Sequence, residues 1–179
     1  MGKEREDENL KTGTRSWFKN SSNGHWHGDE FYTRYCDVES GLKLFDLRGL
    51  KIYCPCDTDE SNFVQYMKDN GLTFKNTSDD YYEHDDLYKW CDIVITNPPF
   101  KNNTKWLRWL VDTYDKKFIL VQPLFSIKNR YQAGFFEKRE WFLDGCLDRF
   151  NTPEGEKRAA AVWMSNIKNR NEIVEREEH

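Results

Sequence analysis

The sequence has no long hydrophobic run. Its longest apolar stretch is FILV, residues 118–121, whereas a membrane-spanning helix needs about 20 consecutive apolar residues. The first residues, MGKEREDENLK, contain no apolar segment of the kind that a signal peptide carries. We therefore expect a soluble, intracellular protein that makes no contact with a membrane.

Cysteine and histidine are also sparse. The 5 cysteines are scattered, and only Cys54 and Cys56 lie close together in the sequence. This spacing indicates neither a disulfide framework nor a four-ligand zinc site, so we expect reduced thiols, most of them buried. His25, His27 and His84 do not have the spacing of a metal triad. We expect no metal.

The composition indicates one folded domain and excludes disorder for most of the chain. The sequence has 179 residues, of which 37% are hydrophobic and 16% aromatic. Aromatic side chains each bury a large area, so a sizeable core can form. Residues 1–28 show no period of 2 or 3.6 and are predicted to be a mobile arm. Residues 29–168 are predicted to form one domain, and residues 169–179 a charged tail.

Charge is unevenly distributed along the chain. Residues 1–100 contain 12 basic and 19 acidic side chains, whereas residues 101–170 contain 14 basic and 8 acidic ones. The second half mixes cations with aromatic residues and could follow a phosphate backbone. An ordinary solvated surface is the alternative. The residues concerned are Trp106, Arg108, Trp109, Lys116, Lys117, Lys128, Arg130, Tyr131, Lys138 and Arg139.

Hydrophobic periodicity predicts alternating helices and strands. Apolar residues spaced by 3 and 4 from Phe31 to Phe45 predict a helix with Asp29 as its N-cap. Short apolar runs predict strands at 50–54, 72–75, 92–96 and 117–122, with helices at 60–71 and from Asn103 or Thr104. Residues 159–167 are predicted to form a late strand, antiparallel at an edge. The alternation favours an α/β fold, a mostly parallel sheet with helices on both faces.

Ligands of such a sheet bind where the strands end, and the loop after Thr96 is the most informative. It reads Asn97, Pro98, Pro99 and Phe100. This tetrapeptide resembles the (N/D)PP(Y/F) motif of S-adenosylmethionine-dependent methyltransferases that act on an exocyclic amine, usually adenine N6. A plain turn that ends the strand is the alternative.

Five ordered blocks extend the resemblance beyond this motif. The sequence resembles the EcoRI-type adenine-specific DNA methyltransferase family from about Asp29 to Ile167. A Rossmann-like class I methyltransferase fold and the cofactor S-adenosylmethionine are thereby implied. Most such enzymes have a glycine-rich turn after the first strand, but here that loop has no glycine. The blocks are DEFYT (29–33), YCPCDTDESNFVQY (53–66), DIVITNPPF (92–100), YDKKFIL (114–120) and FNTPEGEKR (150–158).

The catalytic roles follow from this resemblance. Asn97 Oδ1 and the Pro98 carbonyl would accept hydrogen bonds from the target amine, whose lone pair is otherwise delocalised into the ring. Pro98 and Pro99 would stiffen the turn, and Phe100 would stack on a base flipped out of the duplex.

The resemblance also implies a set of cofactor residues. The carboxylates of Asp57 and Asp59 would face the cofactor's amino and sulfonium groups, and Ser61 and Asn62 would offer helix N-terminal amides to its carboxylate. Helix capping alone is the alternative. Further candidates come from three other segments, with helix packing as the alternative for the first and a solvated acidic run for the last. They are Phe31, Tyr32 and Thr33, then Cys54, then Asp79 and Asp80.

The resemblance therefore predicts an adenine N6 methyltransferase with DNA as its partner, in the cytoplasm of a bacterial cell, with a phage gene as one source. Only about 80 residues follow the NPPF motif, fewer than target recognition usually requires, so a second protein chain or a homodimer could supply it. The alternative is a catalytically silent binding module with the same fold, a decoy or regulator of a nucleic-acid-processing system.

Overall fold

The computed structural model describes residues 32–78, 82–98, 103–124, 142–152 and 155–167. All of them belong to one of the two compact units of the chain, Tyr32–His179. Their helices are α2 (Tyr35–Leu42), α3 (Asn62–Asp69), α4 (Asp85–Trp90) and α5 (Asn103–Tyr114). Their strands are β1 (Tyr32–Thr33), β2 (Lys51–Pro55), β3 (Thr73–Thr77), β4 (Ile93–Thr96), β5 (Lys117–Pro123), β6 (Phe142–Thr152) and β7 (Gly155–Ser165).

These strands form one mixed sheet in the order β1-β6-β7-β5-β4-β2-β3. β3, β2, β4 and β5 are parallel, and β7 pairs antiparallel with both β5 and β6. β6 therefore points the same way as β5, and the short β1 pairs antiparallel with β6. The predicted α/β fold with a mostly parallel sheet is confirmed.

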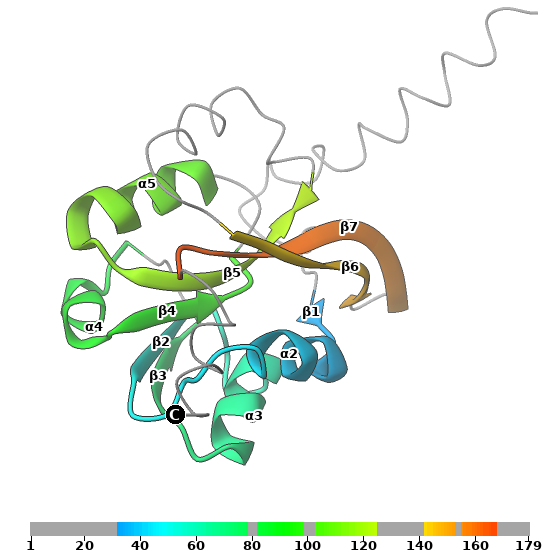
Figure 1. The fold of residues 1–179 in the computed structure, drawn as a ribbon, viewed down its shortest axis with the longest axis horizontal. Coiled ribbons are helices and arrows are strands. Elements are labelled where there is room, and N and C mark those ends of the chain that lie inside the picture. Colours follow the sequence, from blue (N-terminus) through cyan, green and yellow to red (C-terminus); the bar gives the residue numbers. More distant parts are fainter. Residues whose placement is uncertain (1–31, 79–81, 99–102, 125–141, 153–154, 168–179) are drawn as a thin grey trace, which may run out of the picture. The chain divides into compact units, whose positions relative to one another are not determined.

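Helices cover both faces of the sheet (Figure 1). On one face, α4 and α5 pack on side chains of β2, β4, β5 and β7. The buried cluster on that face comprises Tyr53, Tyr88, Cys91, Val94, Trp106, Leu107, Leu110, Val111, Phe118, Leu120 and Met164. On the other face, α2 and α3 meet the indole of Trp163 in β7. The Phe63 ring centroid lies 5.9 Å from that of Trp163, and a Cβ on Gly41 would overlap the indole.

The first predicted helix begins later than expected. Tyr32 and Thr33 form β1, because they pair with Asn151 and Phe150 of β6. α2 then starts after Arg34, whose carbonyl accepts the first helical hydrogen bonds from Asp37 and Val38. Asp29 is therefore not the N-cap, and that expectation was wrong. Phe45 is also outside the helix, which ends at Leu42.

Two further elements differ from expectation. α4 was not predicted; its first residues, Asp85 and Asp86, are exposed, but Tyr88 of this helix is fully buried, with Trp106 Nε1 donating to its hydroxyl at 3.1 Å. β7 is antiparallel as predicted but lies inside the sheet, because the unpredicted strand β6 pairs along its outer side. The edge position predicted for β7 was wrong.

Candidate functional site

The strand order has one topological switch point, between β2 and β4. From β2 the chain passes to β3 on one side, and it then returns to β4 on the other side. Loops that leave adjacent strands in opposite directions create a crevice at the carboxyl edge of such a sheet, and ligands bind there. The loops after β2 and β4 are those that the sequence analysis singled out.

Asp57 is the centre of the loop after β2. Its side chain is only 7% exposed, and its two carboxyl oxygens contact hydroxyl groups of two different elements. Ser61 Oγ donates to Oδ1 at 2.6 Å, and Thr96 Oγ1 lies 2.7 Å from Oδ2. Burial raises the pKa of Asp57 to about 6, although the hydrogen bonds to Ser61 and Thr96 act in the opposite direction.

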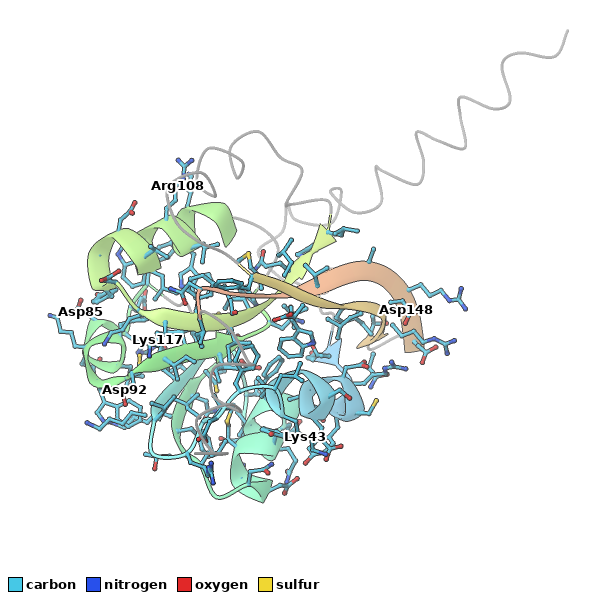
Figure 2. The ribbon with its side chains drawn as sticks, viewed as in Figure 1. Lys43, Asp85, Asp92, Arg108, Lys117 and Asp148 are labelled. Atoms are coloured by element: carbon cyan, nitrogen blue, oxygen red, sulfur yellow. The ribbon has the colours of Figure 1, made fainter. Side chains whose placement is uncertain are left out.

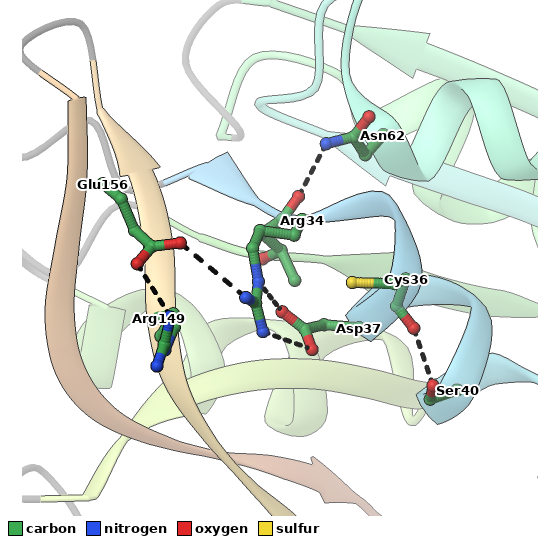
Figure 3. Close-up of polar contacts among 8 residues, drawn as sticks. Arg34, Cys36, Asp37, Ser40, Asn62, Arg149 and Glu156 are labelled. Carbon is green, nitrogen blue, oxygen red and sulfur yellow. Dashed lines mark hydrogen bonds and ion pairs between the residues drawn. The ribbon is translucent and has the colours of Figure 1, made fainter.

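Ser61 and Asn62 begin α3. Ser61 is the N-cap, and its Oγ accepts from the Phe63 backbone N–H at 3.1 Å, so this residue caps α3, whereas its predicted role toward the cofactor stays a prediction. Asn62 Nδ2 donates to the Thr33 carbonyl at 2.8 Å and so ties α3 to β1 (Figure 3).

Cys56 explains how a loop without glycine makes this turn. Its φ is 63°, in the left-handed region that glycine adopts most easily. The preceding Cys54 is fully buried in β2, and burial raises the pKa of its thiol, so it is a neutral thiol. Of the four cysteines with described side chains, Cys54 and Cys91 are buried, Cys56 is intermediate and Cys36 is exposed.

Asn76, near the end of β3, is a site residue that the sequence analysis missed. Its Nδ2 donates to the Asp57 carbonyl at 2.9 Å and lies 3.2 Å from Asp59 Oδ1. It thereby fixes the loop after β2 against the neighbouring strand. Its position at the end of a parallel strand was the available signal. Asp79 and Asp80, the candidates predicted in the loop after this strand, lie outside the described residues.

Thr33 contributes a buried hydroxyl. The residue is 3% exposed, and within the described part of the chain its Oγ1 has no hydrogen-bond partner. Tyr32, by contrast, is 48% exposed, and Phe31 is outside the described residues. A buried hydroxyl is costly unless a partner satisfies it, so this position beside α3 fits a polar ligand such as the predicted cofactor.

The loop after β4 starts beside Asp57. Thr96 is fully buried, and its Oγ1 lies 2.6 Å from the Pro55 carbonyl as well as 2.7 Å from Asp57. Asn97, with a buried Oδ1, and Pro98 follow directly. Pro99 and Phe100 lie outside the described residues, so their roles stay predictions.

Contacts therefore connect the predicted residues on three elements. One continuous path leads from Thr33 through Asn62 and Ser61 to Asp57, and from there through Thr96 to Asn97. Asp59 is exposed and is linked to this group by Asn76, which also binds the Asp57 carbonyl. The catalytic and cofactor assignments themselves stay predictions. Among the described residues, no cluster of His, Cys, Asp and Glu could hold a metal ion.

A mostly parallel sheet with one antiparallel strand inserted beside β5 is the Rossmann-like arrangement of class I methyltransferases, which use S-adenosylmethionine. The sequence is similar to the Type II methyltransferase M.EcoRI of Escherichia coli, with 30% identity over an alignment that covers 68% of this chain and 53% of the relative. The chain thus spans about half the length of this curated relative. No family model matches the chain.

Solved structures resemble the chain more distantly. A precorrin-6y C5,15-methyltransferase of Geobacter metallireducens has a TM-score of 0.46 and 13% identity, and the match covers 79% of this chain and 96% of the other. A protein of Pyrococcus horikoshii described as a candidate RNA methyltransferase has a TM-score of 0.43 and 13% identity, with 72% of this chain and 81% of the other covered. Neither likeness bears on the substrate.

Proposed function

We propose that this protein is an S-adenosylmethionine-dependent methyltransferase that modifies the exocyclic N6 amine of adenine in DNA. One observation carries the proposal: Thr96, which directly precedes the NPPF motif, lies 2.7 Å from Asp57 in the loop predicted to bind the cofactor. A methyl donor and its acceptor must be adjacent, and this contact joins the two loops that would hold them.

The target amine would be activated by acceptors from the loop after β4. Asn97 Oδ1 and the Pro98 carbonyl would each accept one N–H of the amine, which localises the nitrogen lone pair for attack. Phe100 would stack on the flipped base, and the displaced amine proton would leave to water. When bound, S-adenosylmethionine supplies the electrophilic methyl group for a direct in-line transfer.

The cofactor would be held by the group around α3. Thr33 Oγ1 would receive or donate a hydrogen bond, and the first turn of α3 would favour a carboxylate. Because both oxygens of Asp57 already contact Ser61 and Thr96, we assign Asp57 to shaping the loop and Asp59 to direct contact. The left-handed Cys56 supports the view that the glycine-free loop still makes the required turn.

DNA is the proposed partner, and a second chain or a second copy would supply recognition of the target sequence. The curated relative is about twice as long as the matched part, which leaves room for such a region in that protein. None of the described helices has both the length and the apolar character needed to cross a bilayer.

The test is methyl transfer from tritiated S-adenosylmethionine to unmethylated plasmid DNA, with N6-methyladenine identified by mass spectrometry. We expect label in adenine and none in cytosine. If label appears in an RNA or a small-molecule substrate instead, the protein is a methyltransferase but the assignment of DNA as its substrate is wrong. If no substrate is labelled, calorimetric titration with S-adenosylmethionine tests the alternative, because absence of cofactor binding at millimolar concentration would favour the silent binding module.

A further inference from the structure

Thr96 has one hydroxyl proton and two acceptors. Its Oγ1 lies 2.6 Å from the Pro55 carbonyl and 2.7 Å from Asp57 Oδ2, and both distances are within the range of hydrogen bonds between oxygens. A hydroxyl group can donate only one hydrogen bond at a time. The second contact therefore needs a proton from elsewhere.

A proton on Asp57 Oδ2 would satisfy the arrangement completely. Asp57 would then donate to Thr96 Oγ1, and Thr96 would donate to the Pro55 carbonyl, so that each contact has its own proton. When Asp57 is ionised, Thr96 must donate to the carboxylate, and its hydrogen bond to Pro55 is lost. Ser61 fits both states, because its Oγ accepts from the Phe63 backbone N–H and donates to Asp57 Oδ1.

Among the described residues around Asp57, no other group supplies a proton to the contact between Asp57 Oδ2 and Thr96 Oγ1. β2 contributes the fully buried thiol of Cys54, and Cys56 lies in the loop directly after this strand. β3 contributes Asn76, which binds the Asp57 main chain and also Asp59, the neighbouring carboxylate of the same loop. From α3 come Ser61 and Lys68, whose Nζ donates to the Asp59 carbonyl at 3.2 Å.

We infer that Thr96 is a positioning residue for Asn97 and that the proton on Asp57 decides whether the Thr96 hydroxyl donates to the Pro55 carbonyl of β2 or to the Asp57 carboxylate. Asn97 is the next residue after Thr96, so a change of partner moves or loosens the start of the NPPF loop. The role of Asn97 in this inference rests on the proposed function, whereas the exchange of partners does not.

The exchange can be measured without catalysis. In the full chain labelled with ¹³C and ¹⁵N, the Asp57 carboxyl carbon, assigned through bonds, should titrate with a midpoint near pH 6. The backbone and side-chain amide signals of Asn97 should shift with the same midpoint. An Asp57 midpoint near 4, the ordinary value for aspartate, or Asn97 signals that do not follow Asp57, would overturn the inference.

Two substitutions of Thr96 test whether its hydroxyl couples Asn97 to the titration of Asp57 or whether these residues are only close together. Thr96→Val removes the hydroxyl at nearly constant shape and should uncouple the Asn97 signals from the Asp57 titration. Thr96→Ser keeps the hydroxyl and should restore the coupling. If Thr96→Val unfolds, the wild-type and Thr96→Ser titrations still decide, because the serine variant must then behave as the wild type does.

Activity supplies an independent readout. Thr96→Val should lower kcat by about 10- to 100-fold, as expected for a misplaced catalytic group, with cofactor affinity unchanged, and Thr96→Ser should recover most of the rate. If the wild-type protein transfers no methyl group, the proposed function is refuted. The NMR titration still tests whether Thr96 changes its hydrogen-bond partner when Asp57 is protonated. Coupled titration with unchanged kcat in Thr96→Val would confirm the exchange and refute the positioning of Asn97.

Discussion

Asn62 Nδ2 donates a hydrogen bond of 2.8 Å to the carbonyl oxygen of Thr33. This contact joins the first residue of α3 to the last residue of β1, which are 29 positions apart in the sequence (Figure 3). The contact matters for the site because Thr33 also carries the buried hydroxyl that we propose to form a hydrogen bond with the cofactor.

Asn62→Ala should therefore weaken cofactor binding. Loss of one hydrogen bond costs about 1 kcal/mol, which corresponds to an affinity about fivefold lower. Calorimetric titration with S-adenosylmethionine measures this change. Asn70→Ala is the matched control, since it removes the same amide at the exposed C-terminal end of α3. Equal affinities for the two variants would contradict the role of β1 in the cofactor site.

Asn97→Ala should reduce kcat about 100-fold or more, because one of two preorganised acceptors for the target amine is removed. Cofactor affinity and thermal stability should change little. Single-turnover methylation of DNA gives the rate of the chemical step. Methylation at the wild-type rate would show that Asn97 has no catalytic role and would favour the alternative, in which the NPPF motif is only a turn that ends the strand.

Asp57 should make stability depend on pH in an unusual direction. Its pKa of about 6 in the folded protein exceeds that of aspartate in an unfolded chain, so the folded state binds the proton more tightly. The resulting stabilisation is complete below about pH 4 and is lost as the pH rises through about 6, by about 2 to 3 kcal/mol.

Asp57→Asn isolates this contribution from the other carboxyl groups. Between pH 4 and 7, the wild type should lose stability relative to the variant, as measured by urea unfolding at each pH. Glu60→Gln makes the same chemical change at an exposed position of the same loop and serves as the control. A difference between the wild type and Asp57→Asn that is constant with pH would show that Asp57 does not titrate differently in the folded state.

Lys105 and Arg108 are proposed to contact DNA phosphates. Both side chains are exposed on α5, which follows the NPPF loop, and Arg108 projects outward from that helix (Figure 2). Charge reversal at each should weaken binding equally for all DNA sequences and lower the salt dependence by about 0.9 per lost phosphate contact. Filter binding at several salt concentrations tests this. Lys51→Glu, at the start of β2 and thus at the opposite edge of the sheet, should leave the slope unchanged.

The sequence was sufficient to predict the parallel core. β2, β4 and β5 are short apolar strands that end in polar or proline residues, and their apolar runs identify them. β3 is more polar, and its position directly after the glycine that ends α3 was the signal for it. β1 was missed because two residues cannot show a period, and their strand conformation depends on pairing with Asn151 and Phe150, far along the chain. α4 was missed because its few apolar residues stand among charged ones, and the burial of Tyr88 depends on contacts with α5 and with Tyr53 of β2.

The site was predictable as a set of loops but not as a network. Strand ends indicated Asp57, Ser61 and Asn97, since parallel strands present their carboxyl ends at one edge. The central role of Thr96 was not predictable, because a threonine at the end of an apolar strand is ordinary and its partners come from β2, 39 and 41 residues away in the sequence.

The position of β7 has a consequence for biosynthesis. Gly155–Ser165 is the last of the described strands in chain order, yet it is the only described link between β5 and β6. The side chains of β5 are buried from Phe118 to Pro123 in the folded protein. During synthesis, one edge of β5 has no strand to pair with until residues 155–165 leave the ribosome. Apolar edges of that kind pair with other chains, so a nascent protein that stalls before Gly155 is prone to aggregate.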